Sequence, residues 1–201
     1  IDSESTINAG TVTVSLTSEL GGNVTTTGEQ VYSGAVIIEG GDRTLTGVDV
    51  TFGATLDGAQ NLVLENSGVT TFTGAVGGIV ALSSLTTDSG GTTAIDGGLV
   101  NTIGGQTYND SVTLGATTLL NGVGVAFGSA IDTGGHDLAL DSTAAGNISV
   151  SGALSGGGEL TVIRGAVQSY AGIMMDGFSV MDVTTSFTFQ GTVDVAGDVL
   201  I

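Results

Sequence analysis

The sequence predicts an all-β protein whose chain coils into a parallel β-helix, a β-solenoid, with rungs of about 20 residues. An aromatic residue followed by small turn residues and an apolar residue recurs at this period, at Tyr32, Phe52 and Phe72. The 36 glycines separate short stretches in which apolar residues alternate with Thr and Ser, a pattern typical of strands and turns. Proline is absent, as expected where nearly every backbone N–H joins a strand ladder.

The formal net charge of −18 comes from 20 acidic side chains against two basic ones, Arg43 and Arg164. Nucleic acids and anionic lipids bind through Lys and Arg, so neither is an expected partner. No apolar run approaches the ~18–20 residues of a membrane span, and we expect no membrane insertion. The chain begins without an initiator Met or a signal peptide, which favours a mature product or a fragment of a longer chain.

The chain divides into three predicted parts. Residues 1–20 form an N-terminal lead with one strand, because apolar and polar residues alternate over 11–16. Residues 21–172 carry the solenoid repeats, and the first full rung is Ser33–Phe52. Each rung contains a strand after the closing aromatic, a glycine turn, a Leu-rich strand, a corner and a Thr/Val strand. Residues 173–201 are more apolar and depart from this pattern.

The closing residues of successive rungs are expected to point inward and to stack as one ladder, since parallel strands pair about 4.8 Å apart. These residues are Tyr32, Phe52, Phe72, Tyr108, Phe127, Tyr170 and Phe189, with Val150 in place of one aromatic. A larger repeat lies above the rung, because Gly28–Tyr32 matches Gly104–Tyr108 at an offset of 108 − 32 = 76 residues. We interpret it as two four-rung cassettes.

Short strands in a rung of this size cannot bury their apolar sides alone, and stacking of rungs solves this problem. An antiparallel β-sandwich is the alternative, since it has similar strand lengths and turn spacing. It does not account for a period that is held along most of the chain.

The open ends of a solenoid expose unpaired backbone and apolar ladders unless something covers them. We therefore expect the ends either to continue in a longer chain or to pair end to end with another subunit. The predicted assembly contact lies in the divergent last part, at Phe178, Met181, Phe187, Leu200 and Ile201.

Three stretches carry a resemblance to a known family: Tyr32–Val36, Leu82–Asp88 and Gly105–Ala116. Over residues 21–172 the chain resembles the β-strand repeats of filamentous haemagglutinin-like bacterial surface proteins. This resemblance implies a large secreted adhesin built on a right-handed parallel β-helix, located outside the cell or on the bacterial surface. The segment after Gly172 departs from the family pattern.

The acidic corners make calcium the one cofactor to consider, with Asp57, Asp96 and Asp132 as candidate ligands. Calcium requires about six to eight converging oxygen atoms. In the predicted helix Asp57 and Asp132 occupy equivalent positions four rungs apart, roughly 19 Å. Asp96 lies two rungs from Asp57, so we expect diffuse association of cations with the acidic surface.

The remaining polar residues point away from catalysis. His136, the only histidine, lies in a glycine turn with no nucleophile or metal-binding motif nearby, and a solvated turn residue is expected. Carboxylate pairs can hydrolyse glycosides, but the chain has no Trp and its Tyr and Phe are assigned to the core. Arg43 and Arg164 are each expected to pair with a carboxylate on the surface.

The sequence therefore predicts a non-enzymatic structural or adhesive extracellular protein, either a β-helical segment of a large surface adhesin or a filament subunit. The alternative is a carbohydrate- or receptor-binding β-helix module that uses a row of Thr and Ser. A polysaccharide-active enzyme is the least favoured class. Expected partners are further copies or rungs of the same chain, or a glycan or protein on a host or neighbouring cell.

Overall fold

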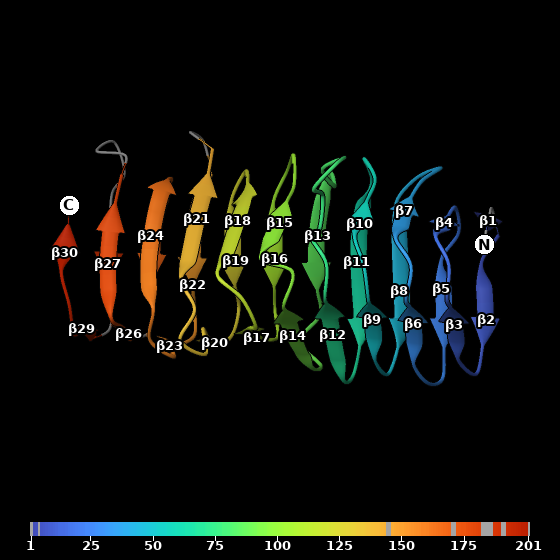
Figure 1. The fold of residues 1–201 in the computed structure, drawn as a ribbon, viewed down its shortest axis with the longest axis horizontal. Helices are drawn as coiled ribbons and strands as arrows, with labels where there is room; N and C mark the ends of the chain where they lie inside the picture. The colour runs from blue at the N-terminus through green and yellow to red at the C-terminus, as the bar shows by residue number, and fades with distance from the viewer. Residues whose placement is uncertain are drawn as a thin grey trace.

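The computed structural model describes residues 2–3, 5–143, 146–169, 172–181, 187–189 and 192–200. These residues form a β-solenoid in which the named strands pair in parallel and stack into three long sheets. Figure 1 shows the rungs following one another along the long axis, with the two ends of the chain at opposite ends of the rod. The predicted parallel β-helix is confirmed, and the antiparallel sandwich is wrong.

Two of the sheets contain ten strands each. Sheet B consists of β2 (Ile7–Ala9), β5 (Val24–Thr26), β8 (Arg43–Gly47), β11 (Asn61–Asn66), β13 (Ser84–Thr87), β16 (Gln106–Tyr108), β19 (Val125–Phe127), β22 (Asn147–Val150), β25 (Ala166–Ser169) and β28 (Phe187–Phe189). Sheet C consists of β3 (Val12–Val14), β6 (Gln30–Tyr32), β9 (Val50–Phe52), β12 (Val69–Phe72), β14 (Thr92–Ile95), β17 (Ser111–Leu114), β20 (Ile131–Asp132), β23 (Leu154–Ser155), β26 (Ile173–Met175) and β29 (Val193–Val195).

Sheet A is built in two parts. The first part consists of β1 (Asp2–Ser3), β4 (Ser18–Leu20), β7 (Val36–Ile38) and β10 (Leu56–Asp57), and the second of β15 (Leu99–Asn101), β18 (Thr118–Gly122), β21 (Leu138–Ser142), β24 (Glu159–Arg164), β27 (Gly177–Val180) and β30 (Val199–Leu200). Val76 joins the two parts through single parallel bridges to Leu56 and Val100. Val76 therefore occupies a strand position of sheet A although it belongs to no named strand.

The chain visits the sheets in the order A, B, C, and each circuit is one rung. Numbered from the N-terminal end, β10–β12 form rung 4, Val76 with β13 and β14 forms rung 5, and β15–β17 form rung 6. Strands β26–β30 pair onto the same three sheets, so the departure of the sequence pattern after Gly172 does not end the solenoid.

The core consists of inward side chains that stack on their counterparts one rung away. In sheet A, for example, Val36 aligns with Leu56, and in sheet B Leu62 aligns with Leu85. All four side chains are fully buried. Burial of one such side chain contributes about 1.5–3 kcal/mol, which explains why three-residue strands persist only when they are stacked.

The closing aromatics form two separate stacks, so the predicted single ladder is wrong. The ring of Phe52 lies between those of Tyr32 and Phe72 in sheet C, with centroids 5.5 Å apart in both pairs. Tyr108 stacks on Phe127 in sheet B, at 5.3 Å. Of the other two predicted members, Tyr170 lies outside the described residues, and Phe189 ends β28 in sheet B, where only its backbone is described.

The physical reason is the length of the larger repeat. From Tyr32 in β6 to Tyr108 in β16 the chain passes ten named strands and the Val76 bridge, which makes eleven strand positions. At three positions per rung this is three and two-thirds rungs, so the second copy begins on a different sheet. The interpretation as four-rung cassettes is corrected accordingly.

The repeated motif that ends in Tyr32 and Tyr108 forms the same hydrogen bonds at a corner of the rung, whichever two sheets meet there. Tyr32 donates a hydrogen bond to Gln30 Oε1 (3.0 Å), and the Gln30 amide donates to the Thr46 carbonyl (2.9 Å). Tyr108 and Gln106 repeat these bonds at 2.9 Å, with the carbonyl of Asn121 as acceptor. The first network lies between sheets B and C and the second between sheets A and B. Burial raises the pKa of both tyrosines, which keeps the phenols protonated as donors.

Candidate functional site

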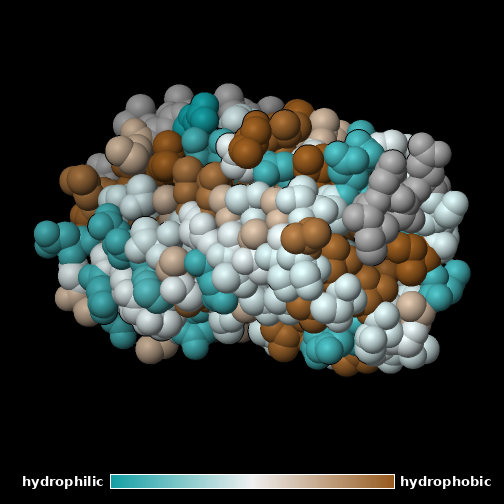
Figure 2. Space-filling view, turned by 45° about the vertical axis from the view of Figure 1, so that its right-hand side comes forward, coloured by the Kyte–Doolittle hydropathy of each residue, from teal (hydrophilic) through white to brown (hydrophobic). Residues whose placement is uncertain are grey.

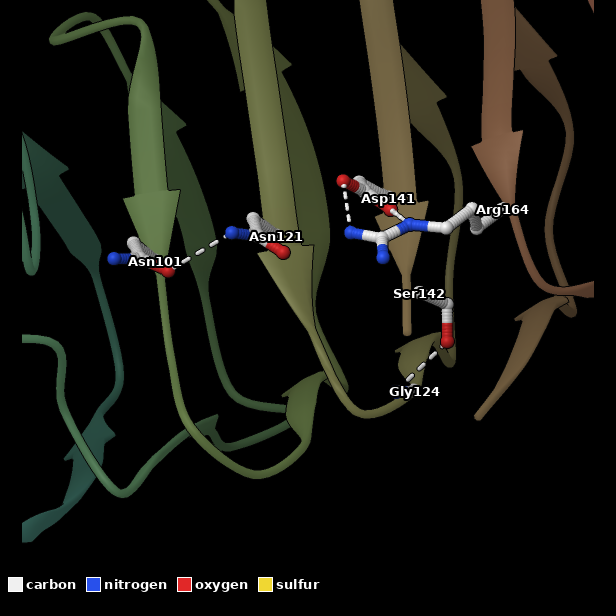
Figure 3. Close-up of polar contacts among 6 residues, drawn as sticks. All are labelled: Asn101, Asn121, Gly124, Asp141, Ser142 and Arg164. Atoms are coloured by element: carbon white, nitrogen blue, oxygen red, sulfur yellow. Dashed lines mark hydrogen bonds and ion pairs between the residues drawn. The ribbon is translucent and has the colours of Figure 1, made fainter. Parts of the chain in front are cut away.

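A column of polar side chains follows the outer surface of sheet A over four successive rungs. Strand register aligns Asn101 with Asn121, Asn121 with Asp141, and Asp141 with Arg164. Figure 3 shows these side chains in a row across the strands. We call these four residues the sheet A column. Its first three members are 20 residues apart in the sequence, a signal that could have identified them beforehand.

Hydrogen bonds give the column a direction. Asn101 Nδ2 donates to the carbonyl oxygen of Gly77, and Asn121 Nδ2 donates to Asn101 Oδ1, both at 3.1 Å. Asn121 Oδ1 is thereby turned toward Asp141, as Figure 3 shows. An amide oxygen and a carboxylate both accept hydrogen bonds, and the Arg164 guanidinium is the donor that lies beside them in Figure 3.

The column ends in an ion pair. Arg164 Nε lies 2.6 Å from Asp141 Oδ1, and Arg164 Nη2 lies 2.8 Å from Asp141 Oδ2. The register shifts by one residue after Leu140, and this β-bulge lets Arg164 face Asp141. The Arg164 side chain is 42% exposed, so the pair contributes about 0–1 kcal/mol. The predicted surface pairing of Arg164 is confirmed.

Apolar side chains line the corner beside the column. Ile79 (83% exposed), Ile103 (64%) and Val123 (43%) occupy the A–B corner of three successive rungs. Beneath this corner the buried hydroxyl of Ser142 accepts a hydrogen bond from the amide of Gly124, at 3.0 Å (Figure 3). Figure 2 shows hydrophobic residues (brown) gathered in patches between surface of intermediate (white) and hydrophilic (teal) character. The column and the corner together offer a polar row beside an apolar edge.

Protein-family models, curated proteins and solved structures give no match to this chain. The chemistry of its surface is therefore interpreted from geometry alone.

The three predicted calcium ligands do not converge. Asp57 is buried in sheet A, where its Oδ1 accepts the amide hydrogens of Ile79 (2.8 Å) and Val80 (3.0 Å). Asp132 lies in sheet C and accepts from Gly134 N, and Asp96 is exposed after β14. The expected equivalence of Asp57 and Asp132 is wrong, because the repeat returns on another sheet. In the described part of the chain, no three His, Cys, Asp or Glu side chains are grouped around a possible metal position.

Among the residues that the structure describes, Arg43 forms no ion pair with a carboxylate, so its expected surface pairing is wrong. Its side chain is buried at the A–B corner of rung 3, where its guanidinium donates to the carbonyl oxygens of Leu20, Gly21, Glu39 and Asp42. The corner residues Gly40 and Gly41 have positive φ angles, 68° and 135°, and the chain folds around the guanidinium. Arg43 thus stabilises the corner by donating hydrogen bonds to its backbone carbonyl oxygens.

The predicted glycine turn at His136 is present. Its amide donates to the carbonyl oxygen of Thr133 at 2.9 Å, and Gly134 and Gly135 both have positive φ angles.

The predicted assembly residues divide between core and surface. Phe178 is 5% exposed and packs in the core, because its strand β27 aligns it with buried Leu160. Met181 and Leu200 are both 69% exposed. Phe187 begins β28 with only its backbone described, and Ile201 lies outside the described residues. In the described ranges no helix is long and apolar enough to cross a membrane.

Proposed function

We propose that this chain is a rod-forming part of an extracellular structural or adhesive protein, either a segment of a large bacterial surface adhesin or a subunit of a filament. The observation that supports this most is the continuity of sheets B and C, each with ten strands in parallel register. Nine spacings of about 4.8 Å make a rod about 43 Å long. Such a rod holds whatever it carries at a fixed distance and direction.

The outer surface of the rod combines an uncharged column with a high overall negative charge. One outward column of sheet C is free of charge over six successive rungs and consists of Thr13, Val31, Thr51, Thr71, Ala94 and Thr113. The net charge of −18 makes separate rods repel one another, and salt screens this repulsion.

The ends of the described rod support growth along its axis. Strand β30 pairs only with β27, and β1 pairs only with β4. Each therefore presents one row of backbone donors and acceptors that can pair with a further strand. We expect that strand to come from a continuation of the chain or from a second copy.

Antibody labelling of intact source cells tests the location. Labelling of the outer surface is the expected result, and labelling only after permeabilisation would contradict the proposal. Negative-stain electron microscopy of the purified chain tests the filament form. Fibres are expected if copies add end to end, whereas single short rods at every concentration would leave only the segment of a longer adhesin.

A carbohydrate- or receptor-binding module is a second candidate, favoured by the sheet A column. Asn121 Oδ1 and the Asp141 carboxylate can accept hydrogen bonds from ligand hydroxyl groups. Exposed, apolar Val123 follows Asn121 by two residues in the chain. A glycan array should then show binding that Asn121→Ala abolishes. The matched control is Asn8→Ala, which truncates an exposed amide in sheet B. Equal binding by both variants would exclude the column as the ligand site.

A further inference from the structure

The corner between sheets B and C is widened in rung 5. Strand β13 ends at Thr87 and β14 begins at Thr92, so four residues form this corner. In rungs 4 and 6 the corresponding corners contain two residues each, 67–68 and 109–110. The longer corner is exposed at Ser89 and Gly90, and polar side chains of the three rungs meet beneath it.

A carboxylate without a counter-charge lies under this corner. Asp110 is 4% exposed, and its Oδ1 accepts hydrogen bonds from the hydroxyls of Thr87 (2.8 Å) and Thr93 (2.9 Å). The chain has two basic residues, and both are engaged elsewhere, Arg43 inside the A–B corner and Arg164 on sheet A. Burial of an ionised carboxylate is costly unless a positive charge accompanies it.

A second carboxylate adds to the imbalance. Burial raises the pKa of the Asp110 carboxyl; the two threonine hydrogen bonds lower it, and the negative charge of Asp88 raises it further. Asp88 directly follows Thr87, whose hydroxyl donates to Asp110, so the two carboxylates belong to the same corner on adjacent rungs. Asp88 Oδ1 is enclosed and has no hydrogen-bond partner among the described residues.

A buried amide of rung 4, that of Asn66, lies next to these carboxylates. Asn66 is 2% exposed, and its Oδ1 accepts the hydroxyl hydrogen of Thr70 at 2.7 Å. Its Nδ2 is enclosed and unpartnered within the described part of the structure. Thr70 aligns with Thr93 of the next rung, which places this amide over the Asp110 group. A half-turn of the amide keeps a bond to Thr70 and presents Oδ1 in place of Nδ2.

We propose that this corner binds one calcium ion, with the carboxylates of Asp88 and Asp110 as charged ligands. The hydroxyl oxygens of Thr87 and Thr93 and the turned amide oxygen of Asn66 are the neutral ligands. We call these five residues the B–C corner site. The two carboxylates balance the charge of the ion, and water supplies the remaining ligands.

The ligand chemistry selects calcium among common cations. All five groups offer oxygen, which suits hard cations, and none is an imidazole or thiolate. The ligands come from three successive rungs and a flexible corner, and calcium tolerates such irregular geometry, whereas magnesium demands a near-ideal octahedron. Unlike Asp57, Asp96 and Asp132, the two carboxylates lie on adjacent rungs, about 4.8 Å apart along the axis.

Calcium titration calorimetry and thermal unfolding in calcium and in EDTA test the site. The wild-type chain is expected to bind one ion in a saturable manner at high NaCl concentration and to unfold at a higher temperature in calcium. Asp110→Asn should weaken the affinity about 100-fold, because one of two charged ligands is lost. In EDTA the same substitution should raise the unfolding temperature, because it removes an uncompensated buried charge.

The matched control is Asp132→Asn, which removes the same charge from an exposed position in sheet C and should leave the affinity unchanged. Terbium luminescence tests the site without substituting any of the proposed ligand residues. Tyr108 lies two residues from Asp110 and should sensitise a bound terbium ion, and Tyr108→Phe should remove most of the signal.

Three results would overturn the proposal. The first is the absence of saturable binding to the wild-type chain. The second is an equal loss of affinity in Asp110→Asn and Asp132→Asn, which would show diffuse association with the acidic surface. The third is an Asp110→Asn variant that is more stable than wild type in calcium as well as in EDTA, which would show that calcium does not compensate the buried carboxyl group.

Discussion

Removal of the Phe52 ring tests how the rungs are held together. Phe52 is 1% exposed, and its ring lies nearly parallel to those of Tyr32 (13°) and Phe72 (6°), with both centroids at 5.5 Å. A buried Phe→Ala substitution costs about 3–5 kcal/mol. Each stacked aromatic pair adds about 0.5–1.5 kcal/mol beyond burial. With two such pairs lost, we expect Phe52→Ala to lower the free energy of unfolding by about 4–8 kcal/mol.

Phe127→Ala is the matched control. Phe127 is also 1% exposed, but it stacks on one aromatic ring, that of Tyr108, and aligns with Val150 on the other side. Urea unfolding followed by circular dichroism should give a loss smaller by about 0.5–1.5 kcal/mol, the value of one pair. The slope of the unfolding curve should stay the same in both variants. An equal or larger loss in Phe127→Ala would refute the view that ring stacking adds to burial.

Three further predictions concern a glycine, a buried acid and the two arginines. A β-carbon on Gly77, where φ is 67°, would collide with the Asn101 carbonyl oxygen, so Gly77→Ala should lower stability in thermal unfolding by more than about 1 kcal/mol. In the control Gly10→Ala, the new β-carbon meets no atom within 4 Å, and this variant should be neutral or slightly stabilised. In EDTA, wild-type stability should fall as the pH rises from 3.8 through the raised pKa of Asp110, because the folded state then holds a proton that the unfolded state has lost. The Asp110→Asn variant should lack this pH-dependent loss of stability. Identical pH profiles of the two proteins would contradict the burial of an unpaired acid. Arg43→Gln should lower the free energy of unfolding by about 2–4 kcal/mol, because it leaves buried carbonyl oxygens without donors, and Arg164→Gln should lower it by about 0–1 kcal/mol. Chemical denaturation of both variants measures the difference. Equal losses would be inconsistent with a guanidinium of Arg43 that satisfies the corner carbonyls.

The period of the aromatic residues was sufficient to predict the rungs, because Tyr32, Phe52 and Phe72 align wherever a parallel solenoid repeats every 20 residues. The same reasoning failed at Tyr108. Its local motif is that of Tyr32, but the sheet on which a motif falls depends on how many strand positions precede it. One of those positions is Val76, a single bridge that carries no strand pattern of its own.

The polar sites were harder to predict for two physical reasons. Arg43 was expected on the surface because charge alone does not reveal that backbone carbonyls can satisfy a guanidinium. Asp110 was missed because the sequence of a two-residue corner such as 109–110 does not show which hydroxyls face it from another rung. Asn101 and Asn121, by contrast, carried a visible period of 20 residues, and only its meaning as an outward column required the structure.

The repeat of eleven strand positions determines how a duplicated feature is displayed. A copy made in multiples of whole rungs would place every recognition group on the same side, as a line parallel to the axis. Here each copy moves to the neighbouring face, and three successive units, 33 positions or eleven rungs, return to the first face. Lengthening such a chain by duplication would arrange its binding groups along a helical path around the rod axis. A longer rod of this design could therefore engage partners from every direction without rotating.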